Sequence, residues 1–402
     1  MSEIQQIETD VAIVGAGPAG SIVAWDLAKK GVNVLVLERK QEIGTPKRCA
    51  EGLAIEYMEP LGIEIRPQWA LNRIKAAYIY SPSGKKVLMN TGAEGYIIER
   101  KIFEKYLATE AIKMGARYMV KTQVTGLIKE NGAVTGLTAE GLDGPIKVKA
   151  KIVVGADGVD SKVGFWAGIS NPNPLKDYHS GYQYEMAGIK NIEEDHLHIF
   201  FGGGGSPGGY VWIFPKGNST ANVGLGINAL ISKDGSRAKD YLDKFISNHP
   251  QFFEKASYLE VNCGGIPMNP GIGSMVSNGL MLVGDAAHQV NPLHGGGIGI
   301  AMEAAKIAAD VSAAAIKEGD VSAQRLSEYE KLWMKKHGNR LNKLLKLRYF
   351  FEKLGSDELD KIADVIDGGI VNKMVQGDFK AFLKFSFTKA PKLLPLARKF
   401  LT

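Results

Sequence analysis

The apolar positions near the start of the chain predict a strand, a turn, a helix and a second strand. Residues 11–14 form an apolar, mostly β-branched run that ends in a glycine-rich turn. Residues 21–30 then have helix-like spacing, and a second apolar run covers residues 32–37. Continuous apolar runs bounded by glycine are typical of strands buried on both faces. The pattern therefore predicts a βαβ unit with parallel strands.

Beyond this unit the pattern alternates between parallel-sheet elements and hairpins. Two expected strands flank Asn131-Gly132, a dipeptide typical of tight hairpins. Two others flank Pro82-Ser83-Gly84 and predict a small inserted sheet near residues 73–96. Such alternation is typical of a doubly wound domain that carries an insertion. The expected strands are at 73–80, 86–89, 124–129, 133–139 and 152–154, and the helix is at 101–114.

A region with many strands and few helices begins near residue 178. Its expected strands are at 196–201, 210–214 and 221–227, and its helix is at 237–248. A buried strand at 280–283 and a helix from about 295 to 316 then return to the first pattern. We predict an α/β fold, α+β overall, in which a Rossmann-like dinucleotide-binding domain is interrupted by an antiparallel-sheet substrate domain. The predicted parts are residues 1–175 and 269–321 for the first domain, 176–268 for the second, and 322–402 for basic C-terminal helices.

Composition favours an intracellular globular protein. A chain of 402 residues, 45% of them hydrophobic, is long enough for two or three domains. Its two cysteines, Cys49 and Cys263, are far apart, which favours a reducing cytoplasm and argues against a disulfide framework or a zinc cluster. The first strand leaves no room for a signal peptide, and no apolar run reaches the roughly 20 residues of a membrane span. We expect a cytoplasmic protein without a bound metal.

The net charge of +6 is concentrated toward the C-terminal end. Thirteen basic residues and no acidic ones occur in residues 331–348 and 379–402, so the rest of the chain is net acidic. A solvated helix face is the usual explanation, but contact with anionic lipid headgroups at the inner face of the membrane is favoured here. Nucleic acid is disfavoured because no recognised binding module accompanies the charge. Apolar residues interleave with the later basic ones, namely Phe379, Phe382, Phe385, Phe387, Leu393, Leu394 and Phe400.

The glycines after the first strand have the spacing of a dinucleotide-binding turn. Gly15 permits the tight turn, Gly17 lets a pyrophosphate approach bare backbone, and Gly20 lets the helix lie close to the sheet. Free N–H groups and the positive helix end then bind the phosphates. Glu38 lies where a carboxylate accepts the ribose hydroxyls and repels a 2′-phosphate. These residues leave two ligands, FAD and NAD.

Two later acidic positions favour FAD. Asp157-Gly158 follows one expected buried strand, and Gly284-Asp285 follows another. Together with the glycine turn they resemble the flavin-dependent monooxygenase and reductase group, in which one dinucleotide fold holds FAD without a separate nicotinamide domain. Residues 295–297, three glycines, open a helix whose N–H groups would stabilise the negative charge of a reduced flavin by ~1 kcal/mol. Close packing of that helix on the sheet is the alternative.

A narrower resemblance is carried by two motifs. One is Arg48-Cys49-Ala50-Glu51-Gly52, and the other is the Tyr-x-Trp-x-Phe-Pro segment within residues 207–216, which Gly224-Leu225-Gly226 follows. Both resemble the geranylgeranyl reductase family, in particular its archaeal ether-lipid reductases, over about residues 8–350. The resemblance implies FAD contacts at Ala19, Glu38, Cys49, Ala50, Gly52, Arg100, Val124, Asp285, Gly297 and Ile298. It also implies hydrogenation of the C=C bonds of geranylgeranyl chains in 2,3-di-O-geranylgeranylglyceryl phospholipids to saturated phytanyl chains.

Three aromatic residues of the second motif alternate along one expected strand. Tyr210, Trp212 and Phe214 therefore point to one face of the sheet. Such a face is most often core. The neighbouring proline and glycine turns favour a cavity wall, and an aromatic wall suits a long prenyl chain, whose burial contributes about 25 cal/mol per Å² before binding costs. We predict that these three residues bind the substrate.

Reduction of an isolated alkene needs an acid as well as a hydride from reduced flavin. No carbonyl accepts charge, so a proton must arrive with or before the hydride, and aromatic faces can stabilise the cation-like species. Cys49 is the predicted donor because of its place in the first motif, although a free cysteine is more often inert core. Tyr210, His288 and His294 are competing donors.

Several alternatives remain at this point. The same fold serves aromatic monooxygenases, and a related chain could bind prenyl groups without chemistry or reduce the prenyl side chain of a pigment or quinone. The electron donor is external, and ferredoxin, a reduced deazaflavin and NADPH are all compatible with a chain that has no nicotinamide domain of its own. Neither the number of double bonds reduced nor the oligomeric state follows from the sequence.

Overall fold

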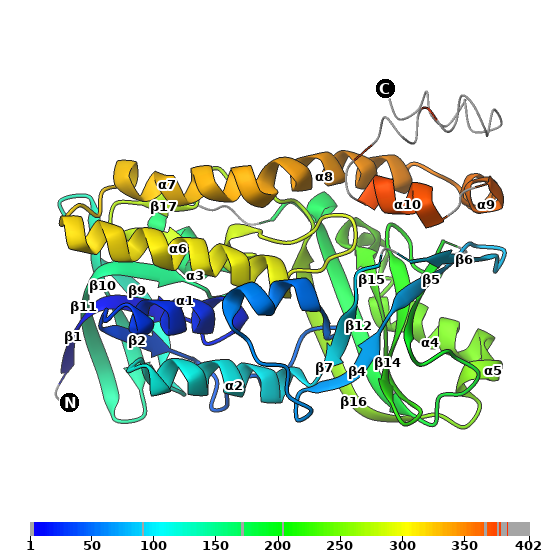
Figure 1. Ribbon diagram of the computed structural model, residues 1–402, viewed down its shortest axis with the longest axis horizontal. Coiled ribbons are helices and arrows are strands. Elements are labelled where there is room, and N and C mark those ends of the chain that lie inside the picture. The colour runs from blue at the N-terminus through cyan, green and yellow to red at the C-terminus, as the bar shows by residue number, and fades with distance from the viewer. Residues whose placement is uncertain are drawn as a thin grey trace.

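The computed structural model describes residues 4–90, 92–169, 173–202, 205–365, 368–375, 378 and 384. Within these residues the strands form an eight-stranded, a seven-stranded and a three-stranded sheet. Figure 1 shows the eight-stranded sheet at one end of the long axis and the seven-stranded sheet at the other. The chain crosses between the two sheets several times, so each is built from segments that are far apart in the sequence.

The eight-stranded sheet has a parallel centre. Its strands are β1 (Gln5–Val14), β2 (Val34–Leu37), β8 (Arg117–Met119), β9 (Gln123–Glu130), β10 (Ala133–Gly141), β11 (Gly144–Gly155), β17 (Val276–Ser277) and β18 (Leu280–Leu282). The order β18-β11-β1-β2-β8 is parallel throughout, and β17 and the β9–β10 hairpin add antiparallel pairs. All four residues of β2 are buried, as expected for a Val-Leu-Val-Leu strand covered on both faces.

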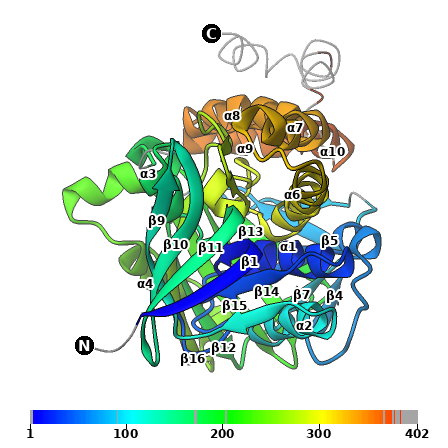
Figure 2. The same ribbon diagram turned by 90° about the vertical axis from the view of Figure 1, so that its left-hand side faces the viewer.

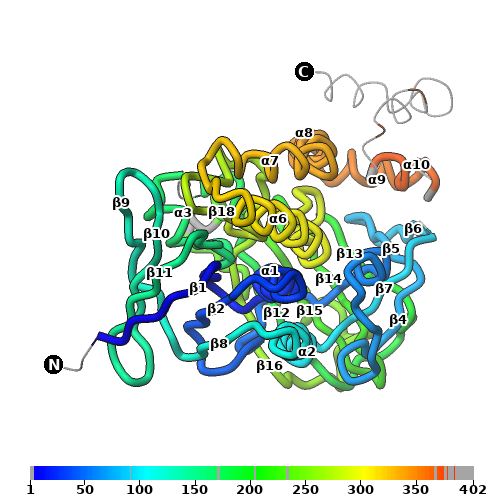
Figure 3. Tube along the Cα trace, turned by 60° about the vertical axis from the view of Figure 1, so that its left-hand side comes forward, coloured from blue at the N-terminus to red at the C-terminus, as the bar shows by residue number. Residues whose placement is uncertain are grey.

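Helices cover this sheet, and three of them lie where the spacing of apolar residues predicted helices. They are α1 (Pro18–Lys29), α2 (Arg100–Lys113), α3 (Lys162–Ala167), α6 (Ile298–Glu318) and α7 (Ala323–Trp333). Helix α1 packs against both α2 and α6, and Figure 3 shows it between them. The strand expected at 152–154 is only the end of β11, whose earlier half alternates buried and exposed residues and joins the β9–β10 hairpin. The hairpin edge of the sheet faces the viewer in Figure 2.

The seven-stranded sheet is antiparallel except for one parallel pair. Its strands are β5 (Ala76–Tyr80), β6 (Lys86–Met89), β12 (Tyr178–Ala187), β13 (His196–Phe201), β14 (Tyr210–Gly217), β15 (Thr220–Asn228) and β16 (Ser257–Pro267), in the order β16-β12-β15-β14-β13-β5-β6. One face packs Val211, Ile213 and Leu225 against the helices α4 (Ala238–Asn248) and α5 (Pro250–Phe253). The side chains at the alternate positions of these strands point to the other face of the sheet.

The strand predicted at 73–80 is wrong as a single element, because the chain changes sheets at residue 75. The strand β4 (Ala70–Ile74) pairs with β7 (Gly95–Ile98), which also pairs with β3 (Gly52–Ala54) in the three-stranded sheet. β5 instead pairs in parallel with β13, so the β5–β6 hairpin extends the seven-stranded sheet. The small inserted sheet near 73–96 was predicted without this partner, which lies more than a hundred residues further along the chain.

The C-terminal part of the described chain is helical. A π-helical turn (Met334–Gly338) joins α7 to α8 (Asn339–Glu352), and α9 (Ser356–Val365) and α10 (Gly368–Val375) follow. α7 and α8 together run along the long axis (Figure 1). Asp360 of α9 accepts hydrogen bonds from Ser81 and Ser83 in the β5–β6 turn, which attaches this end to the seven-stranded sheet. The remaining short elements are 3₁₀ turns at Ile55–Tyr57, Glu59–Leu61, Leu175–Asp177, Ala229–Asp234 and Gly284–Ala287.

Among the described residues, none of these helices has the length and apolar content needed to cross a bilayer. The basic and aromatic residues of the predicted lipid-contacting segment, from Phe379 to Phe400, lie outside the described part of the chain apart from the exposed Lys384.

Candidate active site

A cavity of about 1060 Å³ connects the eight-stranded sheet to the seven-stranded sheet and the C-terminal helices. Every predicted site residue except Gly20 lines it. At one end are the glycine turn after β1 and the start of α6, and at the other are apolar side chains of β5, β6, β13 and α8–α10. The structure therefore brings the predicted cofactor residues and the predicted substrate residues together in one space.

The glycine turn is shaped by the absence of side chains. Gly15 has a φ of +102°, and a Cβ at that position would lie 2.5 Å from the carbonyl oxygen of Ala156. A Cβ at Gly20 would lie 2.0 Å from the carbonyl oxygen of Gly15, so α1 packs on the turn itself. A Cβ at Gly17 would meet no heavy atom within 4 Å, because Gly17 faces the cavity at the N-terminus of α1. This open cradle at a helix N-terminus fits a pyrophosphate.

Glu38 is fixed beside the same turn. It follows β2, is 7% exposed, and lines the cavity. One carboxylate oxygen accepts the N–H of Ala16 at 2.8 Å, and the other accepts the N–H of Lys40 at 2.9 Å. A carboxylate held by two backbone donors keeps lone pairs for a ribose hydroxyl, which fits the predicted role.

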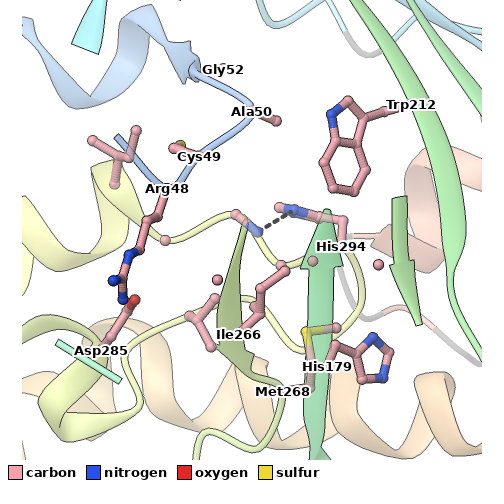
Figure 4. A pocket seen from close by; sticks show the side chains of 18 of the residues that line it. Arg48, Cys49, Ala50, Gly52, His179, Trp212, Ile266, Met268, Asp285 and His294 are labelled. Carbon is pink, nitrogen blue, oxygen red and sulfur yellow. Dashed lines mark hydrogen bonds between the residues drawn. The ribbon is translucent and has the colours of Figure 1, made fainter. Parts of the chain in front are cut away.

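Asp285 lies at the N-terminal end of α6. It sits on the 3₁₀ turn after β18, and a Cβ at Gly297 would be 3.4 Å from its Oδ1. Burial raises the pKa of Asp285, although the Arg100 guanidinium favours the carboxylate. In Figure 4 the Arg48 side chain extends toward Asp285 across the cavity wall. Ile298 begins α6 at the same place and also lines the cavity.

Arg100 and Val124 form the wall next to Glu38. Arg100 begins α2, donates to Glu104, and lies 3.5 Å from the carbonyl oxygen of Arg48 through Nη1. Val124 is 7% exposed on β9. Asp157, the other acidic residue of the resemblance to flavin enzymes, makes contacts within its own segment. It accepts the N–H groups of Lys162 and Val163 at 2.8 and 3.0 Å and so caps α3.

Cys49 lies in the loop between β2 and β3, with its neighbours Ala50 and Gly52 on the same wall. Its sulfur accepts the N–H of Glu51 at 3.2 Å. Burial raises the pKa of the Cys49 thiol, and the Arg100 guanidinium only partly offsets this effect. The sulfur is therefore protonated at neutral pH, and Cys49 lines the cavity.

The aromatic row on β14 points into the cavity and not into the core with α4. The ring centroids of Tyr210 and Trp212 are 5.9 Å apart, and those of Trp212 and Phe214 are 6.3 Å apart. A Cβ at Gly224 would lie 2.5 Å from the Trp212 ring, which explains the glycine at this position of the motif. Trp212 donates its N–H to Gln183 at 2.9 Å. All three residues therefore line the cavity, which is the position that the cavity-wall interpretation predicted.

The competing acids are poorly suited to deliver a proton. Burial lowers the pKa of His294 to about 4, and its Nδ1 accepts the N–H of Gly296 at 3.1 Å (Figure 4). Burial also lowers the pKa of His288, which makes a hydrogen bond with the Asn269 carbonyl at 3.0 Å. The phenol of Tyr210 donates to the His294 carbonyl, and burial raises its pKa. At neutral pH both imidazoles are therefore neutral, and the Tyr210 hydroxyl is already used as a hydrogen-bond donor to the His294 carbonyl.

Sequence reasoning missed the apolar end of the cavity. Its lining comes from three strands and three helices that the linear pattern does not connect, although each is apolar on alternate or helical positions. This end is suited to a long aliphatic chain. Its residues include Ile79, Val87, Met89, Leu197, Ile199, Leu359, Ile362, Val371 and Met374.

Comparison with known proteins agrees with this geometry. Residues 177–266 match the geranylgeranyl reductase catalytic domain, and residues 10–81 match the FAD dependent oxidoreductases. The chain is 39% identical to digeranylgeranylglycerophospholipid reductase 2 of Methanopyrus kandleri over 98% of this chain and 99% of that protein. It is 45% identical to the digeranylgeranylglycerophospholipid reductase of Methanosarcina acetivorans over 88% of each chain.

A solved structure is similar over the same length. The crystal structure of a geranylgeranyl bacteriochlorophyll reductase-like protein from Thermoplasma acidophilum has a TM-score of 0.89 and 34% sequence identity, and the match covers 98% of this chain and 100% of that one. The predicted fold, with an FAD-dependent oxidoreductase domain, a separate antiparallel sheet and C-terminal helices, is confirmed.

Proposed function

The chain belongs to the geranylgeranyl reductase family of flavin-dependent oxidoreductases, and on this premise we propose that it hydrogenates the C=C bonds of geranylgeranyl chains in 2,3-di-O-geranylgeranylglyceryl phospholipids. The relatives that are 39% and 45% identical carry the name of that activity. The observation that carries the proposal is the continuity of the cavity, which runs from the glycine turn past the aromatic row to an apolar end.

The residues of the polar end suit FAD. Gly17 and the N-terminus of α1 would hold the pyrophosphate, Glu38 the ribose, and Asp285 with the start of α6 the flavin-side half. When it is bound and reduced, FAD supplies a hydride to the substrate. Arg100, Val124, Ala19, Ala50, Gly52 and Ile298 line the remaining wall and are proposed contacts.

Cys49 is proposed to hold the proton that the alkene needs. Its thiol stays protonated at neutral pH, and its loop shares the cavity with the aromatic row. Trp212 and Phe214 present ring faces that would stabilise positive charge developing at the tertiary carbon of the chain. The row would also exclude water, so the proton goes to carbon and not to solvent.

Electrons and substrate are proposed to arrive from outside the described chain. The donor would be ferredoxin, a reduced deazaflavin or NADPH, since the described residues form one doubly wound sheet, which the FAD site occupies. The exposed face of α7, the π-helical turn and α8 carries Lys331, Lys335, Lys343 and Lys346, which suits peripheral contact with an anionic membrane on the cytoplasmic side.

An anaerobic half-reaction tests the proposal. The purified FAD-loaded protein is reduced with dithionite, the digeranylgeranylglycerol phospholipid is added, and flavin reoxidation is followed together with the product mass. We expect reoxidation with a gain of two hydrogens per saturated bond. Reoxidation that requires oxygen, with the lipid unchanged, would overturn the proposal and favour an aromatic monooxygenase. A protein that binds lipid but never FAD would favour a prenyl-binding protein without chemistry.

A further inference from the structure

Around the Cys49 loop lies a group of buried and partly buried charges to which neither the cofactor nor the chain-binding wall gives a role. It consists of Lys47, Glu51 and Glu99 from the N-terminal part and Glu185, Lys216 and Glu260 from the seven-stranded sheet, and we call it the buried charge cluster. The side chains of Lys47 and Glu51 are 0% exposed, and that of Lys216 is 3% exposed. Burying this many charges is costly unless each is paired and hydrogen-bonded.

Glu51 is the centre of the cluster. One carboxylate oxygen accepts the backbone N–H of Arg100 at 2.8 Å. The other accepts Lys47 Nζ at 2.9 Å, Lys216 Nζ at 3.0 Å and Asn222 Nδ2 at 2.8 Å. These partners come from the loop itself, from α2 and from two strands of the sheet. A single carboxylate therefore joins three parts of the protein at one point.

The same residue orients the Cys49 sulfur. Glu51 has a φ of +73°, an uncommon conformation for a residue with a side chain, and its backbone N–H points back to the Cys49 sulfur at 3.2 Å. The neighbouring carbonyl of Ala50 accepts Asn222 Nδ2 at 3.2 Å. A left-handed residue persists in a loop only when its surroundings fix it. The four acceptor contacts of the Glu51 carboxylate supply that restraint.

We propose that Glu51 is a positioning residue, whose carboxylate, held by Lys47, Lys216, Asn222 and the start of α2, fixes the loop that aims the Cys49 sulfur into the cavity. The proposal rests on the proposed function for its effect on turnover, but its structural part stands on the contacts alone. Burial alone would raise the pKa of Glu51, yet Lys216 and Lys47 outweigh burial and hold that pKa below its ordinary value. The carboxylate is therefore charged at neutral pH, as these contacts require.

The test compares Glu51→Gln with Glu99→Gln in a Cys263→Ser background. Glu99 accepts Lys216 at 2.9 Å and so belongs to the same cluster, but no contact of its carboxylate reaches the Cys49 loop. Cys263 is exposed and would react with a thiol reagent, so its removal leaves Cys49 as the one cysteine of the full sequence. Labelling of Cys49 by N-ethylmaleimide is followed by mass spectrometry in the FAD-loaded protein, and the anaerobic lipid reaction is measured in parallel.

In Glu51→Gln we expect Cys49 labelling to rise about tenfold, because two charge-assisted contacts are lost and the loop opens. The lipid-dependent reoxidation rate should fall about 10²-fold with little change in KM, as expected when a reacting group is misplaced by about 1 Å. Glu99→Gln should match the parent in both measurements. Equal labelling in the parent and both variants would overturn the proposal, as would equal effects of the two variants.

Two further results keep the tests separate. If the parent protein reduces no lipid, the proposed function fails while the labelling contrast still decides the role of Glu51. If Glu51→Gln does not fold, Asn222→Ala replaces it, because this change keeps every ion pair and removes the donor to Ala50 and Glu51. Labelling should then rise about fivefold, and labelling at the parent rate would count against the proposal.

Discussion

Two loops enter the same cavity, and they are held in place by opposite means. The glycine turn at Gly15–Gly20 keeps its shape because side chains are missing, and a Cβ at either end would overlap a backbone atom of the turn or of Ala156. The Cys49 loop keeps its shape because side chains are present, namely the carboxylate of Glu51 and the two buried lysines around it. The first loop presents backbone to the cavity, whereas the second presents the Cys49 side chain to it.

The difference fits the role proposed for each loop. A pyrophosphate is bound by N–H groups and a helix N-terminus, so any added atom is an obstacle. A proton donor must be aimed, and a flexible loop in an apolar cavity offers no direction of its own. Ion pairs with fixed geometry supply that direction, although they add little to stability compared with an apolar replacement. The two loops should therefore respond differently to small changes.

The largest effect is expected when a cation is removed from the buried charge cluster. Lys216→Met leaves Glu51 and Glu185 without one partner in a buried site, and the free energy of unfolding should fall by about 3 kcal/mol. Chemical denaturation measures it. The control is Lys75→Met, which removes an exposed pair with Asp195 at 3.1 Å and should cost less than about 1 kcal/mol. Similar losses in the two variants would mean that the second loop is not held by its charges.

A change at Cys49 should affect the rate and leave the fold intact. Cys49→Ser should lower lipid-dependent flavin reoxidation about 10²-fold, at the lower end for a lost general acid. Because burial raises the pKa of the thiol, the parent rate should stay level through pH 8.5, the ordinary cysteine pKa being about 8.5, and fall only at higher pH as the thiol loses its proton. The serine variant should lack this alkaline fall. Full turnover in Cys49→Ser with FAD bound would remove Cys49 from the mechanism.

The glycine turn offers a pair of substitutions that separate folding from binding. Gly20→Ala places a methyl group 2.0 Å from a backbone oxygen and should lower the free energy of unfolding by about 1–3 kcal/mol. Gly17→Ala meets no protein atom within 4 Å and has an ordinary φ of −71°, so only the FAD affinity should fall. Thermal unfolding of the FAD-free proteins and titration with FAD distinguish the two. If Gly17→Ala bound FAD as tightly as the parent, the pyrophosphate would have to lie elsewhere.

The same contrast explains which parts of the site the sequence could predict. Gly15, Gly17, Gly20 and Glu38 lie within one local βαβ unit, so their spacing alone predicted that they come together. Glu51 and Lys216 are 165 residues apart, and nothing in either segment indicates that they meet. For the same reason the parallel pairing of β5 with β13 was missed while the local β5–β6 turn was recognised. Cys49 was predicted as a site residue through a resemblance in its motif, but the contacts of its neighbour Glu51 with Lys216 and Asn222 could be seen only in the assembled sheets.

The smallest effect should come from a hydrogen-bonded link between the Cys49 loop and the aromatic row. Gln183 accepts the Trp212 N–H at 2.9 Å and donates to the Cys49 carbonyl at 3.0 Å, so it connects the chain-binding wall to the loop. Trp212→Phe keeps a ring in the cavity and removes one neutral hydrogen bond of about 1 kcal/mol, which corresponds to about a fivefold lower reoxidation rate. The matched control is Tyr210→Phe, which removes a hydrogen bond to the His294 carbonyl instead.

The rate of Cys49 labelling shows whether the Gln183 link restrains the Cys49 loop as strongly as the buried charge cluster does. Because Gln183 keeps its bond to the Cys49 carbonyl in Trp212→Phe, labelling should rise less than in Glu51→Gln, and in Tyr210→Phe it should not change. A rise in Trp212→Phe as large as in Glu51→Gln would mean that the aromatic row restrains the loop as strongly as the buried charge cluster does. Occupation of the row by a prenyl chain would then tighten the loop as well, and the proton donor would be aimed only when substrate is bound.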